Sequence, residues 1–178
     1  DHHGLFSLIS GLVSASGYDV VNAKIITRSD GYALDTFFIQ NKNRQPITEE
    51  HSKKKLLKII SQGLEGNFNV EKALSKRWEE IPARFRAIKA PTRVIIDNNM
   101  SDEYSILEIK CKNAPGVLYR ITKVITSLGL QINTANVSTY GDRVVDIFYL
   151  KDAFGLKIDN NESMDKVKMS SLKILEET

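Results

Sequence analysis

Two short loops, each ending in glycine just before an amphipathic helix, carry the residues best suited to bind a ligand. The first reads Asp1-His2-His3-Gly4 and the second reads Asn113-Ala114-Pro115-Gly116. A turn that opens a helix exposes unpaired backbone N–H groups, which can hold a carboxylate. Glycine in the last position lets a ligand approach the backbone closely. Both loops are candidate sites for a small carboxylate, and a plain helix-starting turn is the alternative.

Other residues with chemical potential are less well supported. Asp1-His2-His3 matches the opening of a metal phosphoesterase signature, but a two-metal site needs several more Asp and His ligands, and His51 is the one other histidine. Asp35 and Asp146 share strand faces with apolar neighbours, so each could bind an amine or a partner backbone, or point outward at a strand end. Neither has a base or nucleophile nearby, which leaves paired-carboxylate catalysis unsupported.

Binding of RNA and acylphosphatase-type catalysis both lack their characteristic residues. An RNA-binding sheet stacks bases on aromatics in a Lys/Arg-Gly-aromatic strand motif, and no expected strand carries one. Acylphosphatase chemistry would want an Arg in the first loop, and neither loop offers it. A net charge of +3 is too small to argue for nucleic acid by itself.

The composition is that of an ordinary globular protein. Of the 178 residues, 42% are hydrophobic and 26% are charged, which leaves room for two small domains. The lone Cys111 excludes an intrachain disulfide and indicates a reducing, cytoplasmic setting, with Cys111 itself as a buried strand residue. No apolar run approaches the ~18 residues of a membrane span. Because the chain starts without Met, we expect a fragment of a longer protein.

A segment of about forty residues occurs twice and positions both candidate loops. Aligned on Gly4 and Gly116, the copies share Gly17 with Gly129 and Asp35 with Asp146. One residue is dropped between the two strands of the second copy. That gap belongs in a turn, because a slip inside a strand would turn every side chain to the opposite face. Each copy therefore predicts a helix followed by a hairpin.

Hydrophobic periodicity predicts the remaining elements. We expect helices over residues 4–16, 48–62, 70–81, 116–128 and 161–175, and strands over 19–27, 32–40, 93–97, 104–112, 131–140 and 143–151. Turns are expected at 28–31 and at 141–142, and Gly63 is expected to end the second helix. The strand 93–97 is expected to close the first sheet.

These elements predict an α+β fold with two ferredoxin-like β-α-β-β-α-β units in tandem. Residues 1–100 would form the first unit, with the extra helix 70–81 and a connector, and residues 101–178 the second. Each unit is one strand short of the full pattern. The first lacks its leading strand, which we expect to precede Asp1.

The second copy resembles ACT domains, small regulatory modules that bind amino acids. The resemblance is carried by Asn113-x-Pro115-Gly116-Val117-Leu118, by Gly129-Leu130-x-Ile132-Asn133-x-Ala135 and by Val145-Asp146-x-Phe148-Tyr149-Leu150. Together with residues 30–37, 93–98 and 139–149, the order of these stretches is similar to the C-terminal tandem ACT region of bifunctional uridylyltransferase/uridylyl-removing enzymes. This resemblance covers nearly the whole chain.

The resemblance implies a non-catalytic regulatory region that senses glutamine and controls attachment and removal of UMP on the PII signalling protein. It places the ligand loops at Asp1, His3, Gly4 and Leu5, and at Asn113, Pro115, Gly116, Val117 and Leu118, with Asn133 as a side-chain contact. The first copy departs from the pattern, with His3 in place of the Pro and Val21 in place of the Asn, so the second loop is favoured.

The same resemblance implies the chain's setting. No cofactor is expected in the chain itself, Mg²⁺ is expected in the parent nucleotidyltransferase, and neither nucleic acid nor membrane is an expected partner. The rival interpretation is a protein-interaction or ACT–ACT dimerisation module without a small ligand, which would dock through exposed sheet edges and the connector around Arg84, Arg86 and Lys89.

Overall fold

The structure, a computed structural model, describes residues 4–27, 33–88 and 90–176 of the chain. Every helix and strand expected from the sequence is present, with bounds that differ by at most two residues, and one short helix, α4, is additional. The turn expected at 28–31 lies outside the described residues. In chain order the elements are α1 (Leu5–Ala15), β1 (Asp19–Thr27), β2 (Ala33–Gln40), α2 (Glu50–Leu64), α3 (Val70–Glu80), α4 (Ala83–Arg86), β3 (Arg93–Asp97), β4 (Ser105–Lys112), α5 (Val117–Ser127), β5 (Gln131–Tyr140), β6 (Arg143–Lys151) and α6 (Asn161–Glu176).

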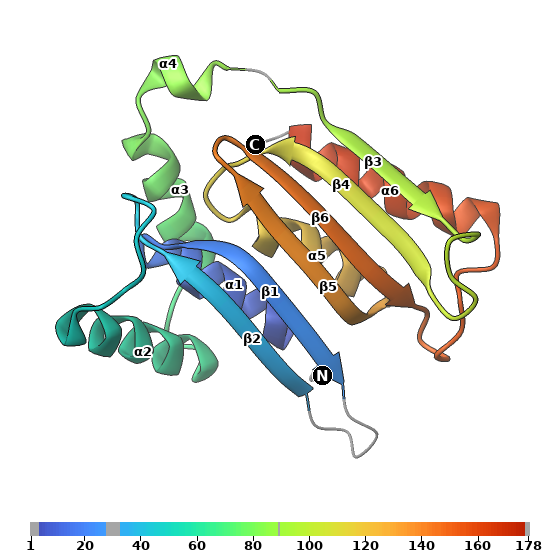
Figure 1. Ribbon diagram of the computed structural model, residues 1–178, viewed down its shortest axis with the longest axis horizontal. Helices are drawn as coiled ribbons and strands as arrows, with labels where there is room; N and C mark the ends of the chain where they lie inside the picture. The colour runs from blue at the N-terminus through green and yellow to red at the C-terminus, as the bar shows by residue number, and fades with distance from the viewer. Residues whose placement is uncertain (1–3, 28–32, 89, 177–178) are drawn as a thin grey trace.

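Two antiparallel sheets lie side by side, with β1 next to β5 and helices α1 and α5 behind them on the same face (Figure 1). The first sheet pairs β1 with β2, and the second has the order β3-β4-β6-β5. Between the sheets, the hydroxyl of Thr139 donates to the carbonyl oxygen of Val20 at 3.2 Å. The fold is α+β with ferredoxin-like units, as predicted.

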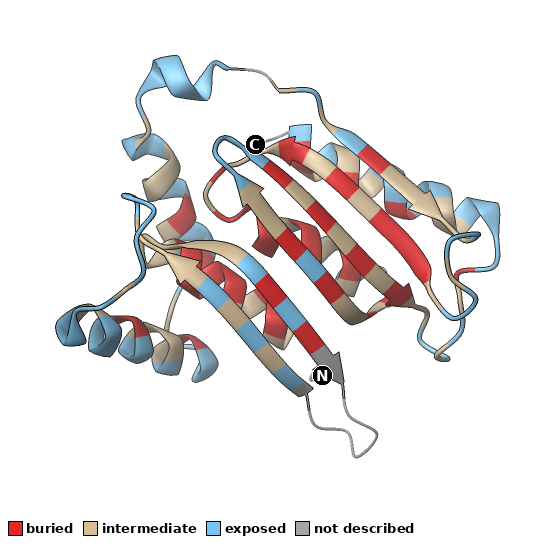
Figure 2. Cartoon of the chain, in the orientation of Figure 1, coloured by how far each residue is buried: buried red, intermediate tan, exposed pale blue. Residues whose placement is uncertain are grey.

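One hydrophobic core joins the two units. It contains Phe6, Ala23 and Ile25 of the first unit together with the inward-facing residues of the second sheet. Along the strands of the second sheet, buried residues alternate with more exposed ones (Figure 2), because successive side chains of a strand point to opposite faces. The interface between the two units is therefore part of the hydrophobic interior of the protein.

Strand β3 belongs to the second sheet, so the expectation that residues 93–97 close the first sheet is wrong. Arg93 pairs with Lys110 and Asp97 with Ile106, antiparallel along β4. The intervening turn explains the pairing: the Asp97 carboxylate accepts the N–H groups of Asn99 at 2.6 Å and Met100 at 3.0 Å. Such a turn reverses the chain and joins neighbouring antiparallel strands. The second unit thereby has four strands.

Gly63 does not end helix α2, contrary to the sequence prediction. The helix continues to Leu64, and the glycine with positive φ is Gly66. Gly63 is buried, and a Cβ atom on it would overlap the side chain of Leu12, which is fully buried in α1. A glycine at this position lets α2 approach α1 closely.

Cys111 faces the core from β4, as the sequence predicts, and we expect it to resist alkylation. Its side chain is 5% exposed, and burial raises the pKa of its thiol to about 12. The thiolate is the reactive form and is scarce near pH 8. Mass spectrometry should find no iodoacetamide adduct on the folded chain and one adduct in urea. Rapid alkylation without urea would contradict this burial.

Candidate functional site

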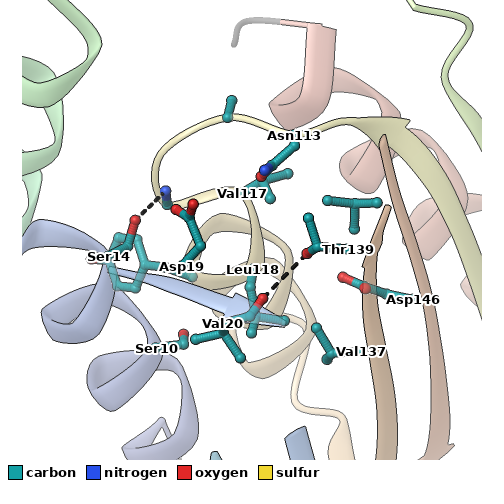
Figure 3. A pocket seen from close by; sticks show the side chains of 14 residues that line it. Ser10, Ser14, Asp19, Val20, Asn113, Val117, Leu118, Val137, Thr139 and Asp146 are labelled. Atoms are coloured by element: carbon teal, nitrogen blue, oxygen red, sulfur yellow. Dashed lines mark hydrogen bonds between the residues drawn. The ribbon is translucent and has the colours of Figure 1, made fainter. Parts of the chain in front are cut away.

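The second candidate loop lines a cavity between the two units (Figure 3). The walls come from α1, the start of β1, the loop, the first turn of α5, and strands β5 and β6. The lining residues are Ser10, Ser14, Asp19, Val20, Asn113, Ala114, Gly116, Val117, Leu118, Tyr119, Val137, Thr139, Val144 and Asp146. The structure thus brings four of the five predicted residues of this loop to one cavity. Pro115 is not among the lining residues.

Most described N–H groups of the loop already have partners, which differs from the expectation of unpaired donors. Gly116 has φ +78 and precedes α5, and its N–H donates to the hydroxyl of Ser14 at 2.8 Å. The N–H of Asn113 donates to the carbonyl of Asp142 at 2.7 Å. Gly116, the N-cap of α5, makes no side-chain capping hydrogen bond, and the first N–H groups of a helix have no intrahelical partner. The positive end of this helix still faces the cavity and favours an anion.

The guanidinium of Arg77 in α3 lies beside Asp19, which is one of the cavity-lining residues of the first unit. The Arg77 Nη2 atom lies 4.0 Å from Oδ1 of Asp19. The Arg77 Nη1 atom also donates to the carbonyl oxygen of Ser14, and lies 3.4 Å from its hydroxyl. Burial raises the pKa of Asp19, and the nearby Arg77 opposes that rise. Asp19 is therefore a partly buried acid with a cation beside it.

Asp146 on β6 is a fully buried carboxyl in the wall of the same cavity. It is 0% exposed, and Oδ1 accepts the N–H of Ser138 at 3.3 Å, while Oδ2 has no partner among the described atoms. Burial raises the pKa of Asp146 to about 8, with the Ser138 hydrogen bond opposing the rise. Of the two orientations left open by the sequence, the outward one is excluded. At neutral pH Asp146 is a mostly uncharged group that can both donate and accept.

The first candidate loop is described only from Gly4 onward, since Asp1 and His3 lie outside the described residues. Gly4 has φ +94 and precedes α1, whose first residue is Leu5, so it matches the geometry of Gly116. Asp35, the counterpart of Asp146, also has a buried oxygen without a described partner, and burial raises its pKa.

Asn133 does not reach the Asn113 loop. It lies in β5 at a bulge between Ile132 and Thr134, whereas the cavity is reached by Thr139, six residues further along the strand. At about 3.3 Å per residue, the two positions are roughly 20 Å apart. The start of β5 instead lies at the same end of the interface as the start of α1 (Figure 1). The structure therefore separates Asn133 from the other predicted residues of the second loop.

More than half of the residues that line the cavity were not selected by the sequence analysis. Ser10, Ser14 and Asp19 come from the other unit. One signal for the serines was available: Ser7, Ser10 and Ser14 fall on the apolar side of α1, and all three are buried. Small polar residues on the apolar face of a helix mark a polar contact in the interior.

The cavity is small in this structure. Its volume of about 30 Å³ matches the space of one water molecule, so an amino acid requires the walls to move. Among the described residues, no three His, Cys, Asp or Glu side chains come together as metal ligands would. None of the described helices is long and apolar enough to cross a membrane.

The sequence of this chain is similar to that of known proteins. A family model for an ACR9-like, ACT-like domain matches residues 93–175, starting at the first residue of β3. The bifunctional uridylyltransferase/uridylyl-removing enzyme of Rhodospirillum rubrum is 41% identical over 168 residues, that of Azospirillum brasilense 39% over 169, and that of Gluconobacter oxydans 38% over 174. These matches cover 94%, 94% and 97% of this chain and 18% of each relative, so the chain spans about a fifth of the relatives' length. The chain therefore belongs to the family of bifunctional uridylyltransferase/uridylyl-removing enzymes, as a segment that contains an ACT-like domain and is consistent with a regulatory role.

Proposed function

We propose that this chain senses a free amino acid, glutamine, in the cavity between its two units. The observation that supports this most directly is the pairing of a helix N-terminus with carboxyl groups across one inter-unit cavity. An amino acid carries a carboxylate that the start of α5 can hold and an ammonium that suits Asp19. Asp146, uncharged at neutral pH, suits the amide of a glutamine side chain because it can donate and accept at once. The preference for glutamine rests on the family resemblance.

The mechanism is a shift between two arrangements of the units. The cavity of about 30 Å³ cannot hold an amino acid, so ligand binds a wider arrangement and increases its population. Because residues of both units line the cavity, this change alters how the units pack against each other. We propose that the parent enzyme responds to this change by switching between attachment of the uridylyl group to PII and removal of that group. The catalytic chemistry, with Mg²⁺, would belong to other parts of the parent.

Asp19→Asn is expected to weaken glutamine binding by about tenfold or more, since a hydrogen bond to a charged group contributes roughly 1.5–3 kcal/mol. Calorimetry on the full chain measures this directly. Asp102→Asn, which removes an exposed carboxylate outside the cavity, is the matched control and should bind as the wild type does. Equal affinity for glutamine and unrelated amino acids would contradict the proposal that glutamine is the specific ligand.

A second function, association with another protein, is favoured by one observation on β2. Leu34 and Phe38 on this strand are 58% and 56% exposed, and the outer edge of β2 has no strand partner among the described residues. Exposed strand edges readily pair with other chains. Asp19→Asn separates the two functions, because it should weaken ligand binding and leave any association, measured by sedimentation, unchanged.

A further inference from the structure

We propose that helix α3 is autoinhibitory: it holds the inter-unit cavity closed by placing the chain's own polar groups where a ligand would bind. The inference rests on the proposed ligand site and adds a means of regulating it. Three contacts support this role. The first involves the backbone N–H of Gly116, the second involves the Asp19 carboxylate, and the third is the packing of Leu74 against Gly116.

The first contact occupies a backbone donor of the loop. The Ser14 hydroxyl accepts the Gly116 N–H at 2.8 Å in a buried setting, as a ligand carboxylate would. Arg77 of α3 holds that serine in place, since its guanidinium donates to the Ser14 carbonyl and lies 3.4 Å from the hydroxyl. A ligand that binds the Gly116 N–H must therefore displace Ser14, whose position α3 fixes.

The second contact occupies the carboxylate. The Arg77 guanidinium lies 4.0 Å from Asp19, on the group that would accept a ligand ammonium. Both side chains are partly exposed, 21% for Arg77 and 33% for Asp19, so the pair is weak enough to be exchanged for a ligand cation. In Figure 3, Asp19 and Ser14 lie together beside the loop. The Ser14 hydroxyl thus takes the place of the carboxylate of an amino acid, and the Arg77 guanidinium takes the place of its ammonium group.

The third contact fixes α3 on the loop itself. Leu74 is 1% exposed and packs against Gly116 so closely that a Cβ atom on this glycine would lie 2.5 Å from Leu74 Cδ1. One turn earlier, Glu71 accepts from the Tyr119 hydroxyl at 3.0 Å and from Lys123 Nζ at 2.6 Å, which ties α3 to α5. Because α3 contacts α1 and β1 through Arg77, the Gly116 loop through Leu74 and α5 through Glu71, it bridges both units beside the loop that lines the cavity.

The chain carries a reporter of this helix. Its one tryptophan, Trp78, follows Arg77 directly and lines a separate cavity of about 540 Å³, which shares Ala114 and Val117 with the first cavity. The Lys112 Nζ atom lies 6.0 Å from the Trp78 ring. A displacement of α3 changes the surroundings of this indole, so its fluorescence should report opening of the site.

The experiment uses the full chain, with glutamine as the probe, and compares Ser14→Ala and Arg77→Met with the wild type. Each variant removes one internal substitute for the ligand, so each is expected to bind glutamine about 3- to 10-fold more tightly by calorimetry. The unliganded Arg77→Met chain should show Trp78 emission shifted toward that of the liganded wild type. Lys76→Met, on the exposed side of the same helix, should leave both readouts unchanged.

The outcomes separate this inference from the proposed function. Weaker or unchanged glutamine binding in both Ser14→Ala and Arg77→Met would overturn the autoinhibitory role, because the two groups would then be ligand contacts or irrelevant. If neither the wild type nor the variants bind glutamine or other amino acids, the proposed function fails. In that case Trp78 emission and hydrogen exchange at the Gly116 amide decide: no change in Arg77→Met or Ser14→Ala overturns the inference as well.

Discussion

Asp146→Asn is expected to stabilise the fold at pH 7 by up to roughly 4 kcal/mol. The folded chain holds the Asp146 proton up to a pKa of about 8 because the carboxyl is fully buried, whereas the ordinary value is 3.8. Each pH unit above the ordinary value costs the folded state about 1.4 kcal/mol, until the buried carboxyl also ionises. Asparagine has nearly the same shape and can accept the Ser138 N–H, but it has no charge to lose or gain.

The same shift fixes the direction of the pH dependence. Between about pH 4 and pH 8 the folded state binds one proton more than the unfolded chain, so the contribution of Asp146 to the free energy of unfolding falls as the pH rises. Below pH 4 both states are protonated, and above pH 8 both are ionised, so the contribution is constant in both ranges. The advantage of Asp146→Asn should therefore grow from near zero at pH 4 to its full size at pH 8.

Urea unfolding of Asp146→Asn, the wild type and Asp102→Asn at pH 5 and pH 8 tests this expectation. Asp102 is exposed, so Asp102→Asn should follow the wild type at both pH values. A variant advantage that does not grow with pH would show that Asp146 is ionised in the fold. In that case it would suit a ligand ammonium and not an uncharged amide.

The elements of this fold could be predicted from sequence because each leaves a local signal. Helical spacing, strand alternation and the repeat gave bounds within two residues of the observed ones. Strand pairing depends on residues far apart in the sequence, and the prediction assigned β3 to the wrong sheet. Gly63 was misassigned for the same reason. From the local sequence alone, a glycine that ends a helix looks the same as a glycine that makes room for a side chain of another helix, here Leu12.

The candidate site was half predictable for a similar reason. The loop from Asn113 to Leu118 has its own sequence pattern, and the structure places most of it at a cavity. Ser14 and Asp19 reach that cavity, and Arg77 reaches those two residues, only because the two units and α3 pack together. Hydrophobic periodicity along the sequence carries no information on such packing. The resemblance implied Asn133 as a side-chain contact of the ligand, and the length of β5 places it at the other end of the strand from Thr139, which lines the cavity.

Gly116→Ala is expected to destabilise the fold by several kcal/mol, and by more than Gly4→Ala. Both glycines have positive φ, where a side chain costs about 1–2 kcal/mol. At Gly4 a Cβ atom would meet nothing within 4 Å, whereas at Gly116 it would lie 2.5 Å from Leu74 Cδ1. The difference between the two variants, measured by urea unfolding, therefore isolates the contact with α3. Equal costs would show that α3 does not pack on the loop.

Leu74→Ala completes a double-mutant cycle with Gly116→Ala. Leu74→Ala alone should cost about 2–5 kcal/mol, since Leu74 is almost fully buried. In the Leu74→Ala background the alanine at position 116 has room, so its cost should fall toward that of Gly4→Ala, with a coupling of about 0.5–3 kcal/mol. This coupling also means that a larger residue at Gly116 cannot by itself distinguish loss of ligand from displacement of α3. Asp19→Asn leaves the Leu74 contact intact, and so is the cleaner test of ligand binding.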